Sequence, residues 1–229
     1  MERSEVPDPA ALAVLETGLR ELALPAALAE PLAALACLLA QWAARMNLTG
    51  HRSPEAIARR LVLDALAFGQ ALGLGEPASL ADLGSGAGFP GLPLAILWPR
   101  CRVTLVDARE RRHHFQRAAV RSLGLTNVEP RRGRIEALPA ELHQVVVAQA
   151  LARPEEAVAL MLPWVAPGGW LVLPQSAGAA PIDAPAPLVN ARMRSYVVPA
   201  GGPQRALWAA QRPVDADRPP VVLTGRSPS

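Results

Sequence analysis

A glycine-rich segment at residues 82–91 constrains the fold more than any other feature of the sequence. It reads Asp82-Leu-Gly-Ser-Gly-Ala-Gly-Phe-Pro-Gly91, so an acidic residue precedes three alternating glycines. The apolar residues 78–83 predict a strand, and Pro90 or Pro93 suits the first turn of a helix. Because glycine has no Cβ atom, the turn can adopt positive φ angles and admit a ligand close to the main chain. The segment therefore predicts a strand–turn–helix unit with a small-molecule site at one end of a sheet.

Two classes of cofactor fit this turn. Residues 86–91 satisfy the pattern G-x-G-x-x-G, and Asp107 lies about 20 residues further on, as a nicotinamide dinucleotide site requires. The same residues suit S-adenosylmethionine, where Asp82 would offset its cationic groups and Asp107 would accept from both ribose hydroxyls. In either case we expect free N–H groups of the turn and of the following helix to face the ligand. The local spacing alone does not separate these two cofactors.

The second half of the chain favours the methyl donor. Residues 157–164 carry apolar residues at helical spacing, and Pro167-Gly168-Gly169 is expected to end that helix and begin an apolar strand at 170–173. This order resembles the segment between the fourth and fifth strands of class I S-adenosylmethionine methyltransferases. Residues 192–198 and 205–210 look like the hairpin that gives those enzymes an antiparallel edge strand. We therefore expect an α/β, Rossmann-like fold with a largely parallel seven-stranded sheet and helices on both faces.

The length of the chain limits its domain organisation. With 229 residues, 51% of them apolar, it can bury one α/β core and a small appendage. Apolar spacing predicts helices at residues 10–22, 26–45 and 54–72. We expect an N-terminal helical region at 1–75, a cofactor-binding domain at 76–211 and a loose tail at 212–229.

The basic charge is concentrated in one stretch. Residues 100–134 hold ten Arg and three acidic residues, whereas 1–99 hold six and ten, and 135–229 hold seven of each. Such a patch suits phosphate backbones, and a solvated arginine-rich helix is the alternative. The residues expected to bind such a backbone lie on or beside one predicted helix: Arg109, Arg111, Arg112 and Arg117. All 23 basic residues are arginine, which weakens any inference from a single one.

Several site classes receive no support. Cys37 and Cys101 are expected to be reduced core thiols, and the four histidines form no cluster with ligand spacing, so no metal is expected. The longest clean apolar run, residues 32–40, is too short for a membrane span, and the acidic N-terminus has no signal-peptide form. We expect a soluble, cytoplasmic protein with no membrane partner.

Motifs in sequence order resemble the ribosomal RNA small-subunit methyltransferase G family, also called glucose-inhibited division protein B. They cover roughly residues 30–175. The motifs are Trp42-Ala-Ala-Arg-Met-Asn-Leu-Thr49, Leu63-Asp64-x-Leu66, residues 82–94, Val103-Thr-Leu-Val-Asp107, Gly133-Arg-Ile-Glu136 and Pro167-Gly-Gly169.

The resemblance implies methylation of guanine N7 in 16S ribosomal RNA, on the RNA or on the small ribosomal subunit, with S-adenosylmethionine as cofactor. It places Gly84 and Phe89 against the donor, Ile135 and Glu136 at its adenine end and Asp107 at the ribose. Since guanine N7 carries an available lone pair, no catalytic base is expected. The expected cofactor-binding residues are Asp82, Gly84, Ser85, Gly86, Gly88, Phe89, Asp107, Ile135, Glu136 and Gln149.

The chain departs from the family pattern at several positions. The family's Ser-Arg-Ala turn after the fourth strand is Ala148-Gln149-Ala150 here, so a neutral amide replaces a cation. A charged hydrogen bond of ~1.5–3 kcal/mol would fall to about 1 kcal/mol. The family's lysine after the fifth strand corresponds to Pro174 or Gln175, and its basic tail is absent. Two alternatives therefore stay open: a catalytically impaired paralogue that binds S-adenosylmethionine and RNA, and a methyltransferase with another substrate.

Overall fold

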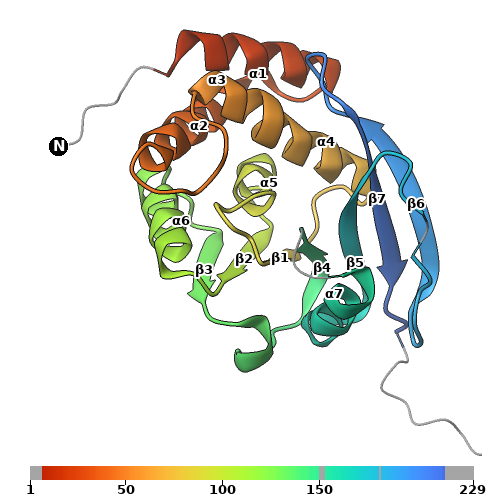
Figure 1. Cartoon of the computed structure of the whole chain (residues 1–229). Coiled ribbons are helices and arrows are strands. Elements are labelled where there is room, and N and C mark those ends of the chain that lie inside the picture. The colour runs from red at the N-terminus through yellow and green to blue at the C-terminus, as the bar shows by residue number, and fades with distance from the viewer. Residues whose placement is uncertain (1–6, 150–152, 181, 215–229) are drawn as a thin grey trace, which may run out of the picture.

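A computed structural model describes residues 7–149, 153–180 and 182–214 of the chain, which form a sheet covered by helices on both faces (Figure 1). Within that part, seven strands are arranged in the order β3-β2-β1-β4-β5-β7-β6. Neighbouring strands from β3 to β5 are parallel, whereas β7 runs antiparallel to both β5 and β6. The strands are β1 (Ser79–Leu83), β2 (Arg102–Asp107), β3 (Val128–Arg132), β4 (His143–Ala148), β5 (Val165–Ser176), β6 (Val189–Val197) and β7 (Gln204–Gln211). The expected α/β fold with an antiparallel C-terminal hairpin is confirmed.

Helices precede and connect these strands. The α-helices are α1 (Pro9–Glu21), α2 (Ala29–Ala43), α3 (Pro54–Ile57), α4 (Leu63–Leu72), α5 (Gly91–Leu97), α6 (Glu110–Ser122) and α7 (Pro154–Met161). Short turns add η1 (Ala26–Leu28), η2 (Ala58–Val62), η3 (Ile135–Ala137) and η4 (Leu162–Trp164), of which η2 is π-helical. Two helices begin at capping residues. The side chain of Asp8 accepts from the N–H of Ala11 at the start of α1, and that of Ser53 accepts from the N–H of Ala56 at the start of α3. A proline follows each capping residue.

The central strands are apolar on both sides, and the alternation of their side chains creates two cores. Leu80, Leu105 and Val147 belong to a core shared with α1–α6, whereas Ala81 and Val146 belong to a second core with α7 and η4. Because successive side chains of a strand point to opposite faces, a sheet covered by helices on both faces needs apolar residues at nearly every position. This explains why the central strands read as continuous apolar runs.

The N-terminal helices share the first core with the sheet. Leu15 of α1, Leu35 of α2 and Leu66 of α4 are fully buried in the same cluster as Leu80 of β1 and Leu207 of β7. Polar contacts also join these helices to the C-terminal hairpin, since Arg194 Nη1 on β6 donates to the carbonyl of Ala71 at 3.1 Å. Residues 7–72 are therefore packed into the same body as the sheet.

Two details differ from the sequence-based expectation. Pro167, Gly168 and Gly169 lie inside β5, which begins at Val165, so they do not separate a helix from a strand. The register between β4 and β5 shifts at this point, and a Cβ atom on Gly169 would lie 2.8 Å from the carbonyl oxygen of Gln144. The glycines thus form an irregularity that lets two backbones approach closely.

The second difference concerns the helical stretch Ala26–Ala43. By length and composition it is apolar enough to cross a membrane, which the run at 32–40 did not suggest. In this fold Leu32, Leu35 and Leu39 are fully buried, and α2 packs against α1, α3 and α6. Its apolar character is therefore used in the protein core.

Candidate active site

The glycine-rich segment connects β1 to α5 at the carboxyl end of the parallel strands. Gly84, Gly86 and Gly88 have φ angles of 75°, 59° and 81°, in the left-handed region that favours glycine. A Cβ atom on Gly88 would collide with the side chain of Leu92, whereas one on Gly86 would meet no atom within 4 Å. The turn therefore needs glycine for packing at Gly88 and leaves open space above Gly86.

Most main-chain N–H groups of this turn have protein partners. Gly84 and Ser85 donate to the carbonyl of Val106 at 2.8 and 3.0 Å, and Gly88 and Phe89 donate to the carbonyl of Ser85 at 2.8 and 3.0 Å. At the start of α5 the N–H of Gly91 donates to Asp82. The expectation that free N–H groups face a ligand is therefore wrong for these residues, because the neighbouring strand, the tight turn and Asp82 satisfy their N–H groups. A cationic ligand, which brings its own donors, remains compatible with this turn.

Asp82 lies beneath the turn and is fully buried. Its Oδ2 accepts from the N–H of Gly91 at 2.9 Å, and Oδ1 has no hydrogen-bond partner among the described residues. Burial raises the pKa of Asp82 to about 7, the hydrogen bond from Gly91 opposes this, and the charge of Asp107 adds to it. A buried acceptor without a donor suits a positively charged group of a ligand.

Asp107 ends β2 next to the same turn and is almost fully buried. Oδ1 accepts from the N–H of Arg109 at 2.8 Å, while Oδ2 accepts from the N–H of Gly86 and from Arg112 Nη1, both at 3.0 Å. Each carboxylate oxygen offers about two lone pairs, so capacity for further donors remains on Oδ1. Arg112, which was predicted to bind RNA, instead forms an ion pair with Asp107, the predicted partner of the ribose hydroxyls.

Gln116, which the sequence patterns did not indicate as a site residue, is a buried residue of α6 that contacts the turn from the side. Its Nε2 donates to Ser85 Oγ at 2.9 Å and to the carbonyl of Gly86 at 2.8 Å. Gln116 and Arg112 are four residues apart and so lie on one face of α6. A polar pair at this spacing in a helix that follows Asp107 was the available signal. Both side chains position the turn and Asp107.

Ile135 and Glu136 form the short turn η3 after β3. Ile135 is buried, whereas Glu136 is exposed and its carboxylate pairs with Arg134 Nε at 2.7 Å. The hydrogen bond from Arg134 lowers the pKa of Glu136. These two residues thus offer an apolar and an anionic surface beside the carboxyl ends of β2 and β3.

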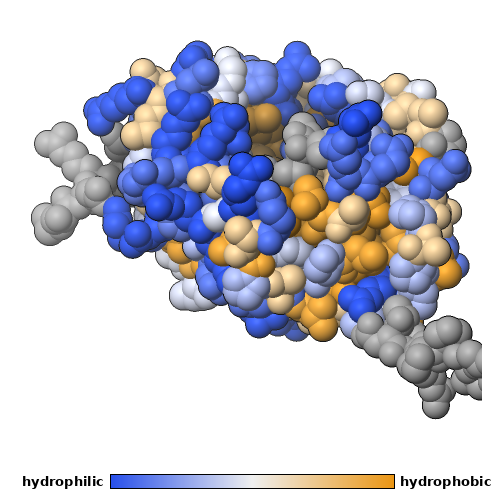
Figure 2. All heavy atoms as spheres, turned by 60° about the horizontal axis from the view of Figure 1, so that its bottom comes forward, coloured by the Kyte–Doolittle hydropathy of each residue, from blue (hydrophilic) through white to orange (hydrophobic). Residues whose placement is uncertain are grey.

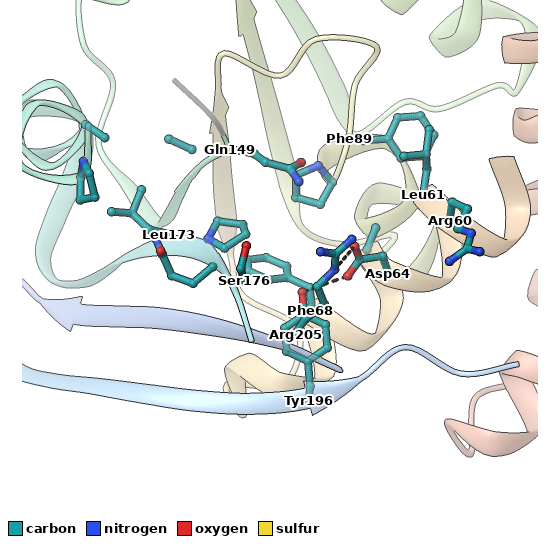
Figure 3. Close-up of a pocket in the computed structure, with 17 residues that line it drawn as sticks. Arg60, Leu61, Asp64, Phe68, Phe89, Gln149, Leu173, Ser176, Tyr196 and Arg205 are labelled. Carbon is teal, nitrogen blue, oxygen red and sulfur yellow. Dashed lines mark hydrogen bonds and ion pairs between the residues drawn. The ribbon is translucent and has the colours of Figure 1, made fainter. Parts of the chain in front are cut away.

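A cavity of about 370 Å³ opens beside the glycine turn (Figure 3). Phe89 and Pro90 line it on the side of the turn, and Gln149, just after β4, lies exposed at its border. The opposite wall comes from α4, β6 and β7 through Asp64, Tyr196 and Arg205. Since cavities of this size accept small organic groups, the site has space for a second ligand group next to the turn.

Several arginines of residues 109–134 fall into two groups. Arg109, Arg111 and Arg117 are exposed, and the described residues supply no ion pair to them. Arg112, Arg131, Arg132 and Arg134 are instead paired with acidic residues. Figure 2 shows hydrophilic side chains gathered on the side of the molecule where α6 lies, with an apolar patch beside them.

His143 and the two cysteines lie in or near the protein core. His143 is buried between Thr104 Oγ1 at 3.0 Å and the carbonyl of Glu141 at 2.7 Å, and burial lowers its pKa. Cys101 is buried and Cys37 is half-buried. Across the described ranges no three His, Cys, Asp or Glu residues form a group able to hold a metal ion.

Comparison with known proteins identifies the family. The family model for GidB, rRNA small subunit methyltransferase G, matches residues 29–179. The ribosomal RNA small subunit methyltransferase G of Chromohalobacter salexigens is 37% identical over 208 residues, which cover 89% of this chain and 99% of that protein. The chain belongs to this family. A relative of the same name from Stenotrophomonas maltophilia strain R551-3 is 45% identical over 141 residues, covering 61% of this chain and 65% of that protein.

Solved structures agree on the fold. A SAM-dependent methyltransferase from Aquifex aeolicus has a TM-score of 0.51 at 20% identity and covers 68% of this chain and 92% of its own. The putative methyltransferase yhhF of Escherichia coli has the same TM-score at 19% identity, with 66% and 86% covered. These similarities confirm the class I methyltransferase fold predicted for this member of the rRNA small subunit methyltransferase G family.

The residues at the turn fit S-adenosylmethionine, which this family implies. Asp82 offers a buried acceptor for a cationic group, Asp107 a carboxylate with remaining capacity, and Ile135 an apolar surface. The space above Gly86 leaves room for a bound group. Gln149 lines the cavity, and its contact with the donor stays a prediction.

Proposed function

We propose that this protein transfers a methyl group from S-adenosylmethionine to N7 of a guanine in 16S ribosomal RNA, in the cytoplasm. Membership of the rRNA small subunit methyltransferase G family supports the reaction and the RNA. The observation that carries the assignment in this chain is the cavity that adjoins the glycine turn at Phe89 and Pro90. It provides an acceptor space directly beside the donor space.

The proposed chemistry requires positioning and no general base. The bound cofactor supplies an electrophilic methyl group, and guanine N7 supplies a lone pair that carries no proton at neutral pH. The protein must then align the nucleophile with the methyl group and exclude water. Asp82 and Asp107 would fix the donor from below and beside the turn, while Phe89 lines the cavity beside the turn.

The proposed RNA contact lies on α6. Arg109, Arg111 and Arg117 are exposed and would bind phosphates of 16S RNA, as free RNA or within the small subunit. A guanine must leave its stack for N7 to reach a donor buried in the protein, so the target is expected to be unpaired or flipped. Arg112 belongs to the donor side in this proposal, through its ion pair with Asp107.

Two measurements test the proposal. Calorimetry with S-adenosylmethionine and with its demethylated product should show binding to the purified chain, and NAD should not bind. Mass mapping of 16S RNA from cells with and without this protein should show one methylated guanine that depends on it. A chain that binds NAD instead, or RNA with unchanged methylation, would contradict the proposal.

A second candidate is a binding protein that keeps affinity for the donor and RNA but has lost turnover. Gln149 favours it, because a neutral side chain stands at the cavity border where the family pattern has arginine. If this candidate is correct, Gln149→Arg should raise methyl transfer from a negligible rate while RNA affinity stays unchanged. If the first proposal is correct, wild-type protein already methylates 16S RNA at a rate sufficient for full modification.

A further inference from the structure

We propose that Asp64 selects guanine in the cavity by accepting hydrogen bonds from its N1–H and 2-amino groups. This inference rests on the proposed function and assigns its substrate-reading residue. The cavity places Asp64 of α4 together with Tyr196 of β6 and Arg205 of β7, which are cross-strand partners in the C-terminal hairpin, far from Asp64 along the chain. None of them belongs to the glycine turn or to the arginine patch.

The carboxylate of Asp64 is held in place but is only partly used. Oδ1 accepts from the hydroxyl of Tyr196 at 2.9 Å, and Oδ2 lies 3.5 Å from Arg205 Nε. That Nε atom is buried and has no hydrogen-bond partner within the described chain, so the ion pair is loose. An ionised carboxylate can accept about four hydrogen bonds, so most of the capacity of Asp64 stays open toward the cavity.

The protein environment keeps Asp64 oriented. It follows the π-helical turn Ala58–Val62, a type of irregularity that often occurs at functional sites. Its side chain is 20% exposed, so it reaches the cavity from a mostly buried position. Burial raises the pKa of Asp64, whereas the hydrogen bond from Tyr196 and the charge of Arg205 lower it. Tyr196 and Arg205 are therefore positioning residues for this carboxylate.

The shape of guanine matches the two sides of the cavity. The 2-amino group of guanine points away from N7 across the ring system, so a base whose N7 faces the donor directs N1–H and the 2-amino group to the far wall. Figure 3 shows Asp64 and Arg205 facing each other near Tyr196, with Phe89 and Gln149 on the other side of the cavity. The half-buried ring of Phe89 offers a surface for stacking.

This arrangement discriminates between the purines. Adenine has no 2-amino group and presents an acceptor at N1, which would meet the carboxylate of Asp64 with repulsion. Guanine presents two donors there, and a carboxylate that accepts both gives charge-assisted hydrogen bonds. A site built to accept donors rejects an analogue that lacks them. Asp64 would thus favour guanine independently of the RNA contacts made by α6.

The test removes the 2-amino group of the target guanine. Once the methylated guanine is mapped, a 16S RNA fragment is made with inosine at that position, which removes only the 2-amino group. Wild-type protein should methylate the guanine RNA at least about tenfold faster, since one charged hydrogen bond corresponds to roughly ten- to a hundredfold. Binding of both RNAs in the presence of S-adenosylhomocysteine provides a second readout that needs no turnover.

Variants then test whether Asp64 causes the preference for guanine over inosine. In Asp64→Asn both RNAs should react more slowly and the preference for guanine over inosine should shrink several-fold, with donor affinity unchanged by calorimetry. Glu55→Gln, which breaks a partly exposed ion pair between α3 and Arg59 of η2, is the matched control and should keep the wild-type preference. The wild-type comparison does not depend on whether any variant folds.

The outcomes separate the two proposals. Equal rates for guanine and inosine in wild-type protein would overturn the role of Asp64 and leave the methyltransferase proposal intact. A full guanine preference in Asp64→Asn would also overturn it and would make Asp64 an anchor for the C-terminal hairpin only. Failure of wild-type protein to methylate any guanine of 16S RNA would overturn the proposed function and this inference with it.

Discussion

At the scale of single residues, Asp82 links the glycine turn to the pH dependence of stability. Its pKa is raised to about 7 in the folded protein, against about 4 in an unfolded chain. The folded state therefore binds an extra proton between these values, and the free energy of unfolding falls as pH rises through this window, by at most about 1.4 kcal/mol per unit. In Asp82→Asn the amide oxygen can still accept the hydrogen bond from Gly91, but the side chain no longer titrates. The decrease in the free energy of unfolding between these pH values should therefore disappear. Urea unfolding at pH 5 and pH 8 measures it, and an equal pH response of both proteins would contradict the assignment.

Asp107 carries a second residue-scale prediction. Asp107→Ala removes the acceptor for Gly86, Arg109 and Arg112, and with it the proposed partner of the ribose hydroxyls. Two charged hydrogen bonds correspond to a loss of affinity for S-adenosylmethionine of at least about a hundredfold. Calorimetry measures this affinity, with Asp183→Ala, a change at an exposed acidic residue, as the control. Unchanged affinity would remove Asp107 from the donor site.

At the scale of elements, α6 presents different faces to the donor site and to solvent. Arg112 and Gln116 face the turn, whereas Arg111 and Arg117 are exposed. Arg111→Glu and Arg117→Glu should each weaken RNA binding and reduce the slope of log affinity against log salt by about 1, with donor affinity unchanged. Arg20→Glu on α1 is the charge-matched control. If the RNA affinity and salt dependence of the Arg111 and Arg117 variants equal those of Arg20→Glu, the exposed face of α6 is a solvated surface that does not contact RNA.

At the scale of the whole molecule, the N-terminal helices and the C-terminal hairpin are parts of one packed body. Leu15, Leu80 and Leu207 belong to a single buried cluster, so we expect one cooperative unfolding transition. Trp fluorescence and far-UV circular dichroism should give the same midpoint in urea. Two separated transitions would show that residues 1–75 fold independently of the sheet.

The junction between α4 and β6 tests the same coupling. Arg194 donates to the carbonyls of Ala71 and Leu72, which end α4, at 3.1 and 3.3 Å. Arg194→Ala should reduce the free energy of unfolding by about 1–3 kcal/mol, because charged donors to buried carbonyls are lost. Arg153→Ala, which breaks an exposed ion pair, should cost no more than about 1 kcal/mol. A smaller effect at Arg194 than at Arg153 would contradict this coupling.

The fold and the position of the site were predictable from the sequence for local reasons. Apolar runs, proline and glycine positions define β1, the turn and β2, since strand formation and positive φ angles depend on neighbouring residues. The antiparallel hairpin at β6 and β7 was also predictable from its turn and from the family resemblance. The role of Pro167-Gly-Gly169 was not, because a close approach of two backbones depends on the partner strand.

The sequence by itself determined the class of fold and the family, and it predicted a ligand site at one end of the sheet, because these follow from short-range patterns. Only the tertiary structure decided which groups are already occupied: the N–H groups of the turn, the pairing of Arg112 with Asp107 and the brace from Gln116. It also brought Asp64 to Tyr196, 132 residues away along the chain. Such pairings depend on how helices and hairpin pack around the sheet, and local spacing carries no information about them.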